Sequence, residues 1–250
     1  MLGLGSSLVT GGASSDWTPA DLGSKLKAWY KYNTGISSAT VSGNLQVTQW
    51  ADQSGNDNHL EPTVTNNKDE MPRLLTDGLS SEALVFFNSN TDSLVFTSAV
   101  TLGKFAMYWK SNWKDTIASE VIFEGDTDNF VKLQGPTEMR LKAGGDVRED
   151  ATIPEVTDDE STPHILGMER AANGSLLAYN NNVAQDSWAS TGDKDGRSPI
   201  ANALEITQMG DAQNPVYYYE VVICDDVLST AERNLLYTWL QNQGSVSYTH

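Results

Sequence analysis

The sequence predicts an all-β protein built as an antiparallel two-sheet sandwich, with a short N-terminal helical turn and one C-terminal helix. Short apolar and β-branched runs recur along the 250-residue chain, and turn residues separate them roughly every ten positions. Helical periodicity is rare, and no long internal repeat is present. Many short strands with few helices are typical of a two-layer β-sandwich.

Two pairs of apolar runs predict hairpins. Residues 83–87 and 94–96 flank the polar turn 88–92, and residues 164–169 and 176–179 flank a turn that contains Asn173-Gly174, a strong hairpin signal. The acidic stretch 149–160, which Pro154 interrupts, predicts a solvated connection between elements.

Two sites carry helix-starting signals. Thr18 can cap a short helical turn that has Pro19 at its first position. Ser229 and Glu232 have the spacing of a capping box, in which each side chain bonds the other residue's backbone N–H. Four apolar residues then share one helix face: Leu235, Leu236, Trp239 and Leu240.

We expect one domain over residues 16–250 behind an extended arm at residues 1–15. The arm has no basic segment and glycines break its apolar part, so it does not predict a signal peptide. Its glycine content makes ordering costly, which predicts that the arm docks on another subunit; the rival interpretation is that it folds back on its own domain. The candidate docking side chains are Leu2, Leu4, Leu8 and Val9.

Charge and composition exclude several function classes. The net charge is −17 with only 16 Lys and Arg, which argues against binding to nucleic acid or anionic membranes. No apolar run approaches the roughly 20 residues that span a bilayer, so we expect no membrane insertion. The single cysteine, Cys224, excludes an intramolecular disulfide framework.

The stretch from Trp50 to Leu60 predicts a tight loop that bonds to itself and pins two strands. A buried aromatic ring precedes residues that turn the backbone, because glycine tolerates positive φ and Asp, Ser and Asn side chains bond nearby backbone N–H groups. We expect His59 to donate a hydrogen bond to a neighbouring strand. The residues of this structural loop are Trp50, Asp52, Ser54, Gly55, Asn56, Asn58 and His59.

This loop, with its order Trp, Asp, Ser-Gly-Asn, Asn-His, resembles the loop signature of laminin-G-like jelly-roll domains of the concanavalin A-like lectin and glucanase superfamily. Phe87 with Asp92 and Leu94 resembles the family's Phe-x-Gly-x-x-Asp-x-Leu strand pair, with Asn88 in place of the glycine. Residues 164–179 and 220–233 resemble its central hairpin and its closing strand and short helix. The resemblance covers most of the chain from Trp17 and implies a jelly roll, a fold that hosts lectins, glucanases, adhesion modules and virion proteins.

The glucanases of this superfamily carry Glu-x-Asp-x-x-Glu on one strand, and retaining hydrolysis needs two carboxyl groups about 5–5.5 Å apart. The nearest match here begins at Glu124 and Asp126, but its last position is Asn129, and an amide cannot protonate a leaving group. A polar β-turn is the favoured interpretation, so we expect no enzymatic activity.

Calcium is the one cofactor that the resemblance makes worth testing, since many relatives bind it through oxygen ligands. Neither candidate cluster has the spacing of a helix-loop-helix calcium loop, and a solvated acidic turn is favoured at each. The first cluster is Asp126, Asp128 and Asn129, and the second is Asp193 with Asp195.

Glycan binding would need exposed aromatic rings beside polar groups. Ordinary packing in strands is the more common role of such rings. The candidate residues are Trp113, Trp188, Tyr217, Tyr218 and Tyr219.

Our leading prediction is a structural protein of a tailed-phage virion, most simply a capsid decoration or accessory protein made in the host cytoplasm. Short, acidic chains with a laminin-G-like jelly roll behind a Gly/Ser arm resemble accessory virion proteins. Its partners would be other virion proteins or copies of itself. The alternative is a glycan-binding or host-adhesion module on a tail or fibre, and a glycosidase is the third class.

Overall fold

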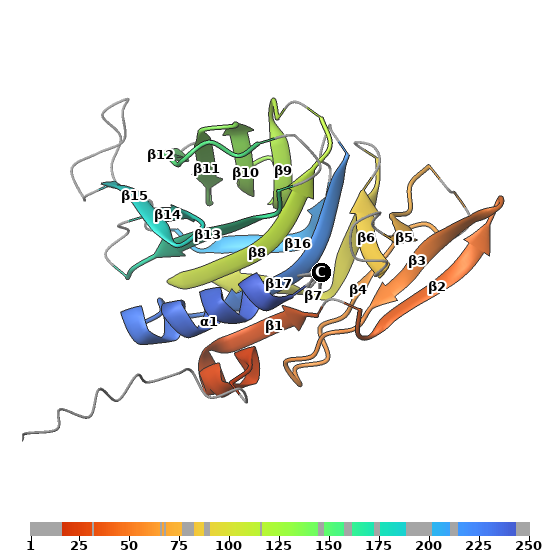
Figure 1. Ribbon diagram of the computed structural model, residues 1–250, viewed down its shortest axis with the longest axis horizontal. Coiled ribbons are helices and arrows are strands. Elements are labelled where there is room, and N and C mark those ends of the chain that lie inside the picture. The colour runs from red at the N-terminus through yellow and green to blue at the C-terminus, as the bar shows by residue number, and fades with distance from the viewer. Residues whose placement is uncertain are drawn as a thin grey trace, which may run out of the picture.

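The protein is a β-sandwich with one helix packed on its outer face (Figure 1). The computed structural model describes residues 17–243 except 32, 66, 68, 77–82, 88–90, 116, 145–147, 158–161, 173–175, 189–201 and 211–214. The predicted arm at residues 1–15 lies outside these residues. The all-β prediction with two short helices is confirmed, and no helix in the described part is long and apolar enough to cross a membrane.

One helix precedes the strands along the chain and the other follows them. The helices are η1 (Pro19–Lys25), a 3₁₀-helix, and α1 (Thr230–Asn242). The first strands are β1 (Leu26–Tyr30), β2 (Ile36–Val41), β3 (Asn44–Trp50), β4 (Leu60–Glu61), β5 (Arg73–Thr76), β6 (Ala83–Phe87), β7 (Ser93–Leu102) and β8 (Phe105–Trp113). The remaining strands are β9 (Glu120–Asp126), β10 (Asn129–Gly135), β11 (Glu138–Lys142), β12 (Arg148–Thr152), β13 (His164–Arg170), β14 (Leu176–Asn180), β15 (Val183–Trp188), β16 (Leu204–Gly210) and β17 (Val216–Cys224).

All the strand pairs in the described part of the chain are antiparallel, and they form two layers. In one layer β17 pairs with β8 along one edge and with β6 and β1 along the other, and β13, β14 and β15 extend the sheet beyond β8. The second layer has the order β4, β7, β16, β9, β10, β11, β12. Strands β3 and β5 bond the two layers into one network at their edge.

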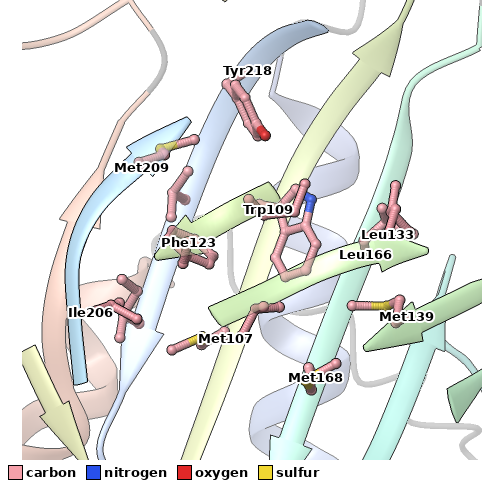
Figure 2. Packing of buried hydrophobic residues seen from close by; sticks show 14 of the residues in the cluster. Met107, Trp109, Phe123, Leu133, Met139, Leu166, Met168, Ile206, Met209 and Tyr218 are labelled. Atoms are coloured by element: carbon pink, nitrogen blue, oxygen red, sulfur yellow. The ribbon is translucent and has the colours of Figure 1, made fainter. Parts of the chain in front are cut away.

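Large apolar side chains fill the space between the layers (Figure 2). Trp109 of β8 packs edge-on against Phe123 of β9, with ring centres 5.7 Å apart, and both side chains are fully buried. Tyr218 of β17 and Met139 of β11 belong to the same cluster. Burial of this apolar surface is the main force that holds the two sheets together.

Helix α1 covers the outer face of the sheet that contains β17 and β8. Its capping box is confirmed: Ser229 Oγ accepts from Glu232 N at 3.2 Å, and Ser229 N donates to Glu232 Oε2 at 2.7 Å. Leu236 and Leu240 are buried against the sheet. Arg233 reaches beneath the helix and donates two hydrogen bonds to the carboxylate of Glu169, at 2.9 and 2.8 Å. Apolar contacts and a part-buried ion pair therefore fix the helix to the sheet.

Two local predictions are wrong. Strands β6 and β7 do not form a hairpin, because β6 pairs with β5 and β17 while β7 pairs with β16 and β4. The acidic stretch 149–160 is not wholly a solvated connection, because Arg148–Thr152 forms β12 beside β11. A cross-strand pair between Arg140 and Asp150 neutralises part of the acidic charge there. The hairpin of β13 and β14 is confirmed.

Candidate functional site

Asp52 is the centre of the predicted loop between β3 and β4. Its Oδ1 accepts from the backbone N–H groups of Trp29 and Ser54, each at 2.9 Å. Its Oδ2 accepts from Ser54 Oγ at 2.7 Å and from Asn58 N at 3.2 Å. The carboxylate thus joins its own loop to β1, and Asn56 adds bonds from its side-chain amide to the carbonyls of Leu26 and Lys27.

The two ends of this loop are fixed differently from each other. Trp50 is fully buried, with its indole N–H bonded to the carbonyl of Lys31 at 3.1 Å. Gly55 has φ +88°, the left-handed conformation that suits glycine. His59 does not donate as expected: its Nδ1 accepts from Asp52 N at 3.1 Å, and its backbone carbonyl makes the bond to Thr97 of β7. All these groups bond within the protein, which matches a structural rather than a catalytic arrangement.

The aromatic residues predicted as glycan contacts do not form an exposed platform. Trp113, Tyr218 and Tyr219 are 0%, 1% and 1% exposed, respectively, so they cannot stack on a ligand at the surface. Tyr218 and Tyr219 are adjacent and both buried, because β17 is covered on both faces: Tyr218 belongs to the core between the sheets, and Lys110 lies over the ring of Tyr219. Tyr217 is half-buried, and Trp188 ends β15 with a side chain outside the described part. These predicted contacts are wrong for the three buried rings.

The predicted calcium cluster at residues 126–129 is occupied by protein groups. Asp126 Oδ1 accepts from Asp128 N at 2.8 Å and from Asn129 Nδ2 at 3.0 Å, and these two bonds lower the pKa of Asp126. Asp128 pairs with Lys142 at 2.6 Å. No group of three His, Cys, Asp or Glu residues in the described part could hold a metal ion. Asp193 and Asp195 lie outside the described residues.

The positions that resemble the glucanase motif also make structural contacts. Glu124 accepts a hydrogen bond from Gln208 of β16 at 3.0 Å. The Asn129 Oδ1 accepts from the backbone N–H groups of Gly144 and Glu205, at 3.1 and 3.2 Å. Gly125 is required because a Cβ there would lie 2.0 Å from the carbonyl oxygen of Glu205. The turn therefore fastens the β9–β10 hairpin to the chain around it.

A cluster that sequence reasoning did not find lies at the C-terminal end of α1. We call it the tryptophan–lysine corner, and it consists of Trp29, Lys31, Lys110, Glu220 and Trp239. The indole N–H groups of Trp29 and Trp239 both donate to Oε1 of Glu220, at 2.6 and 2.5 Å. The two indoles meet edge to face, with ring centres 5.9 Å apart. A strand at the start of the chain and the helix near its end thus share one carboxylate.

Two lysines complete the corner. The Lys31 Nζ lies over both indoles, 5.8 Å from the ring centre of Trp29 and 5.5 Å from that of Trp239, which is cation–π distance. Lys110 is 5% exposed, lies over the ring of Tyr219, and donates to the backbone carbonyls of Gln241 and Gln243. Lysine at a helix C-terminus satisfies the last carbonyls and their partial negative charge.

Burial sets the protonation of the corner. It raises the pKa of the Glu220 carboxyl to about 7, against the two indole hydrogen bonds and the nearby Lys31 and Lys110, which lower it. Burial likewise lowers the pKa of Lys110 to about 8, although Glu220 raises it. The second carboxylate oxygen, Oε2 of Glu220, has no hydrogen-bond partner among the residues that the structure describes. A buried carboxyl with an unpartnered oxygen needs a physical explanation. Strongly shifted pKa values are frequent at functional sites, which makes this corner a candidate.

The corner combines features that a glycan contact needs. Trp239 and Lys31 are half-buried, so both residues of this cation–π contact are partly accessible at the surface. Gln243, also half-buried, places an amide beside them through its bond to the Trp239 carbonyl. Sequence patterns could not group these residues, since Trp29 and Glu220 are 191 positions apart. Trp239 was predicted only as part of a buried helix face.

Comparisons with known proteins identify a shared fold. No protein-family model matches the sequence, and no curated protein is significantly similar to it. The structure is similar to the binding domain of botulinum neurotoxin DC in complex with SialylT, at 12% identity and a TM-score of 0.55, over 84% of this chain and 52% of that chain. It is also similar to the binding domain of Paraclostridial Mosquitocidal Protein 1, at 12% identity and a TM-score of 0.54, over 90% and 54%.

An enzyme has a similar structure as well. An arabinofuranosidase complexed with arabinofuranosyl-alpha-1,2-xylobiose matches at 14% identity and a TM-score of 0.50, over 87% of this chain and 59% of that chain. The chain thus spans little more than half the length of these solved chains. The likenesses agree with the predicted concanavalin A-like sandwich. At such low identity they establish the fold alone.

Proposed function

We propose that the protein is a non-enzymatic glycan-binding or adhesion module whose contact site is the tryptophan–lysine corner. The proposal corresponds to the alternative drawn from the sequence rather than to the leading one. The similar structures support it, since two of the three described above are binding domains and one of these is in complex with SialylT.

One observation carries this proposal. Among the buried and half-buried rings of α1, Trp239 alone joins a part-exposed indole to a cation and a carboxylate in one cluster: Lys31 lies over its ring and Glu220 holds its N–H. Sugars present apolar C–H faces and hydroxyl groups, so a fixed aromatic ring with polar neighbours matches both parts of the ligand. The hydrogen bond to Glu220 fixes the orientation of the ring before a ligand arrives, which reduces the entropy lost on binding.

Hydrolysis is not part of the proposal. In the stretch that resembles the glucanase motif, Asn129 replaces the third acidic residue, and its side chain is bonded to Asp126, Gly144 and Glu205. A glycosidase needs two carboxyl groups on either side of the scissile bond. The arabinofuranosidase likeness carries no weight against this argument, because the chemistry of an enzyme depends on its site and not on its fold.

A glycan array tests the proposal directly. We expect the wild-type chain to bind a subset of glycans and Trp239→Ala to lose that binding by at least about tenfold, since an aromatic anchor commonly contributes more than 1 kcal/mol. Tyr237→Ala is the matched control, because Tyr237 is a half-buried ring two positions earlier on α1 but is outside the corner. A wild-type chain that binds no glycan, or a Trp239→Ala variant that binds as the wild type does, would refute the proposal.

The virion assignment stays a prediction. The three similar structures provide no link to a phage particle, and the arm that carried the docking argument is outside the described residues. Deleting residues 1–15 and measuring incorporation into particles would test it independently of the glycan array.

A further inference from the structure

We infer that the tryptophan–lysine corner prefers acidic glycans, with the Lys31 ammonium as the group that contacts the sugar's carboxylate or sulfate. This inference rests on the proposed function, since it names the class of glycan that the same site takes. The inference depends on the partners of Lys31: the nearby lysines are paired with acidic side chains, and Lys31 is not paired with any in the described part of the chain.

The lysines next to Lys31 in sequence already have acidic partners. Lys25 pairs with Glu232 at 2.8 Å, and Lys27 pairs with Asp225 at 2.7 Å. Lys31 makes no ion pair and no side-chain hydrogen bond with any residue in the described part of the chain, and its contacts there are the two indole faces. An ammonium has three N–H donors, and no acceptor in the described residues takes up those of Lys31, which leaves them for a ligand.

The surroundings of Lys31 favour an anion over a neutral ligand. Lys110 adds a second positive charge close to Glu220, and both lysines lie near enough to lower the pKa of that carboxyl. Glu220 is 0% exposed, its Oε1 accepts from both indoles, and no ion pair joins it to Lys31 in the described part of the chain. With two lysines and one carboxylate, the corner carries a local excess of positive charge even when Glu220 is ionised.

This local charge stands out in a chain of net charge −17. Long-range repulsion from such a chain disfavours polyanions, but it is screened over a Debye length of roughly 8 Å at physiological ionic strength. A direct contact between Lys31 and one acidic group is shorter than that and is screened much less. The corner is therefore expected to accept a glycan with an isolated acidic sugar and to reject densely charged polymers such as nucleic acid.

The test compares acidic glycans with neutral counterparts of the same shape. An array carries sialylated and uronic acid glycans beside their methyl esters, and sulfated glycans beside their desulfated forms, so that the two sources of negative charge are distinguished. The variants are Lys31→Gln, Lys31→Arg and Lys27→Gln. The last is the matched control, because it removes the same charge four positions earlier in the chain, at a residue that is paired with Asp225.

We expect the wild-type chain to bind acidic members of the array about tenfold or more tightly than their neutral counterparts, because hydrogen bonds between charged groups are roughly twice as strong as neutral ones. Lys31→Gln should abolish this preference, whereas Lys31→Arg and Lys27→Gln should keep it. If neutral counterparts bind equally well in a Trp239-dependent manner, or if Lys31→Gln keeps the preference, the inference fails and the proposed function stands. If no glycan of either class binds, both fail.

Discussion

Lys110 of β8 and Glu220 of β17 are paired directly across the sheet, and they are 5% and 0% exposed. Each side chain continues to a different part of the helix: Lys110 bonds the last carbonyls of α1, and Glu220 bonds the indole of Trp239. Two ionisable groups therefore hold the C-terminal end of α1 against the sheet. Buried charges are costly, so the stability of this arrangement must depend on pH.

The first prediction concerns pH between 5 and 8. The pKa of Glu220 is raised from 4.5 to about 7 in the folded protein, so between these values the folded chain binds more protons than the unfolded chain. The free energy of unfolding should then fall as pH rises from about 5 to 7, by on the order of 3 kcal/mol from this group. Urea denaturation at several pH values measures it. In Glu220→Gln this fall should be absent, and a variant that keeps the full slope would show that another group causes it.

Lys110 gives the opposite sign at alkaline pH. Its pKa is lowered from 10.5 to about 8, so above pH 8 the unfolded chain binds more protons and the contribution of Lys110 to stability rises with pH. The two groups together predict the lowest contribution to stability between about pH 7 and 8, where both are charged. Urea denaturation of the wild type and of Lys110→Met between pH 8 and 10 tests this prediction. The free energy of unfolding of the variant should lack the increase with pH that Lys110 causes in the wild type.

The second prediction concerns the Trp239 indole. Trp239→Phe removes one of two hydrogen bonds that stabilise the ionised form of Glu220, so the pKa of Glu220 should rise further. The loss of stability should be larger at pH 8, where Glu220 is ionised, than at pH 6, with a difference of about 1 kcal/mol. Any cavity left by the smaller ring costs the same at both pH values. Tyr237→Phe, on the same helix, should show no such difference.

The third prediction concerns the start of α1. Ser229→Ala removes the oxygen that accepts from Glu232 N, and it should lower the free energy of unfolding by about 1 kcal/mol. Thr230→Ala is the control, because Thr230 is exposed at the first helical position and alanine has the higher helix propensity. Thermal denaturation of the two variants decides the matter, since equal melting temperatures would mean that the cap contributes nothing.

Features that depend on neighbouring residues were predictable from the sequence, and features that depend on distant ones were not. The capping box at Ser229 and the β13–β14 hairpin are local, and both were predicted. Strand β12 was missed because its acidic residues indicate a loop, while its stability comes from pairing with β11 and from Arg140. The burial of both Tyr218 and Tyr219 follows from the cover on both faces of β17, which a simple alternation of buried and exposed faces cannot foresee.

In the candidate site, too, contacts between neighbouring residues were predictable and contacts between distant residues were not. The bonds of Asp52 to Ser54 and Asn58 lie within one loop, and the residue types alone indicated them. The tryptophan–lysine corner joins β1, β8, β17 and α1, and its members are spread from residue 29 to residue 239. Trp29 and Trp239 each fit the pattern of an ordinary core residue. Only their shared contact with Glu220 distinguishes them, and that contact exists in the fold and not in any sequence pattern.

The fourth prediction concerns the loop that follows β3. Trp50 is fully buried against Tyr30, with ring centres 5.6 Å apart, so Trp50→Ala should lower the free energy of unfolding by about 3–5 kcal/mol. Asp52→Ala leaves the backbone N–H groups of Trp29, Ser54 and Asn58 without their acceptor, and unsatisfied buried groups cost about 1–3 kcal/mol each.

Asp57→Asn is the control for this loop, because Asp57 is exposed and asparagine tolerates its positive φ of 55°. Chemical denaturation should give Trp50→Ala and Asp52→Ala a clearly lower free energy of unfolding than the wild type. Asp57→Asn should have the same free energy of unfolding as the wild type. An Asp52→Ala variant as stable as Asp57→Asn would mean that water replaces the carboxylate at little cost. In that case the loop would owe its shape to Trp50 and the backbone, and Asp52 would not be the residue that ties it to β1.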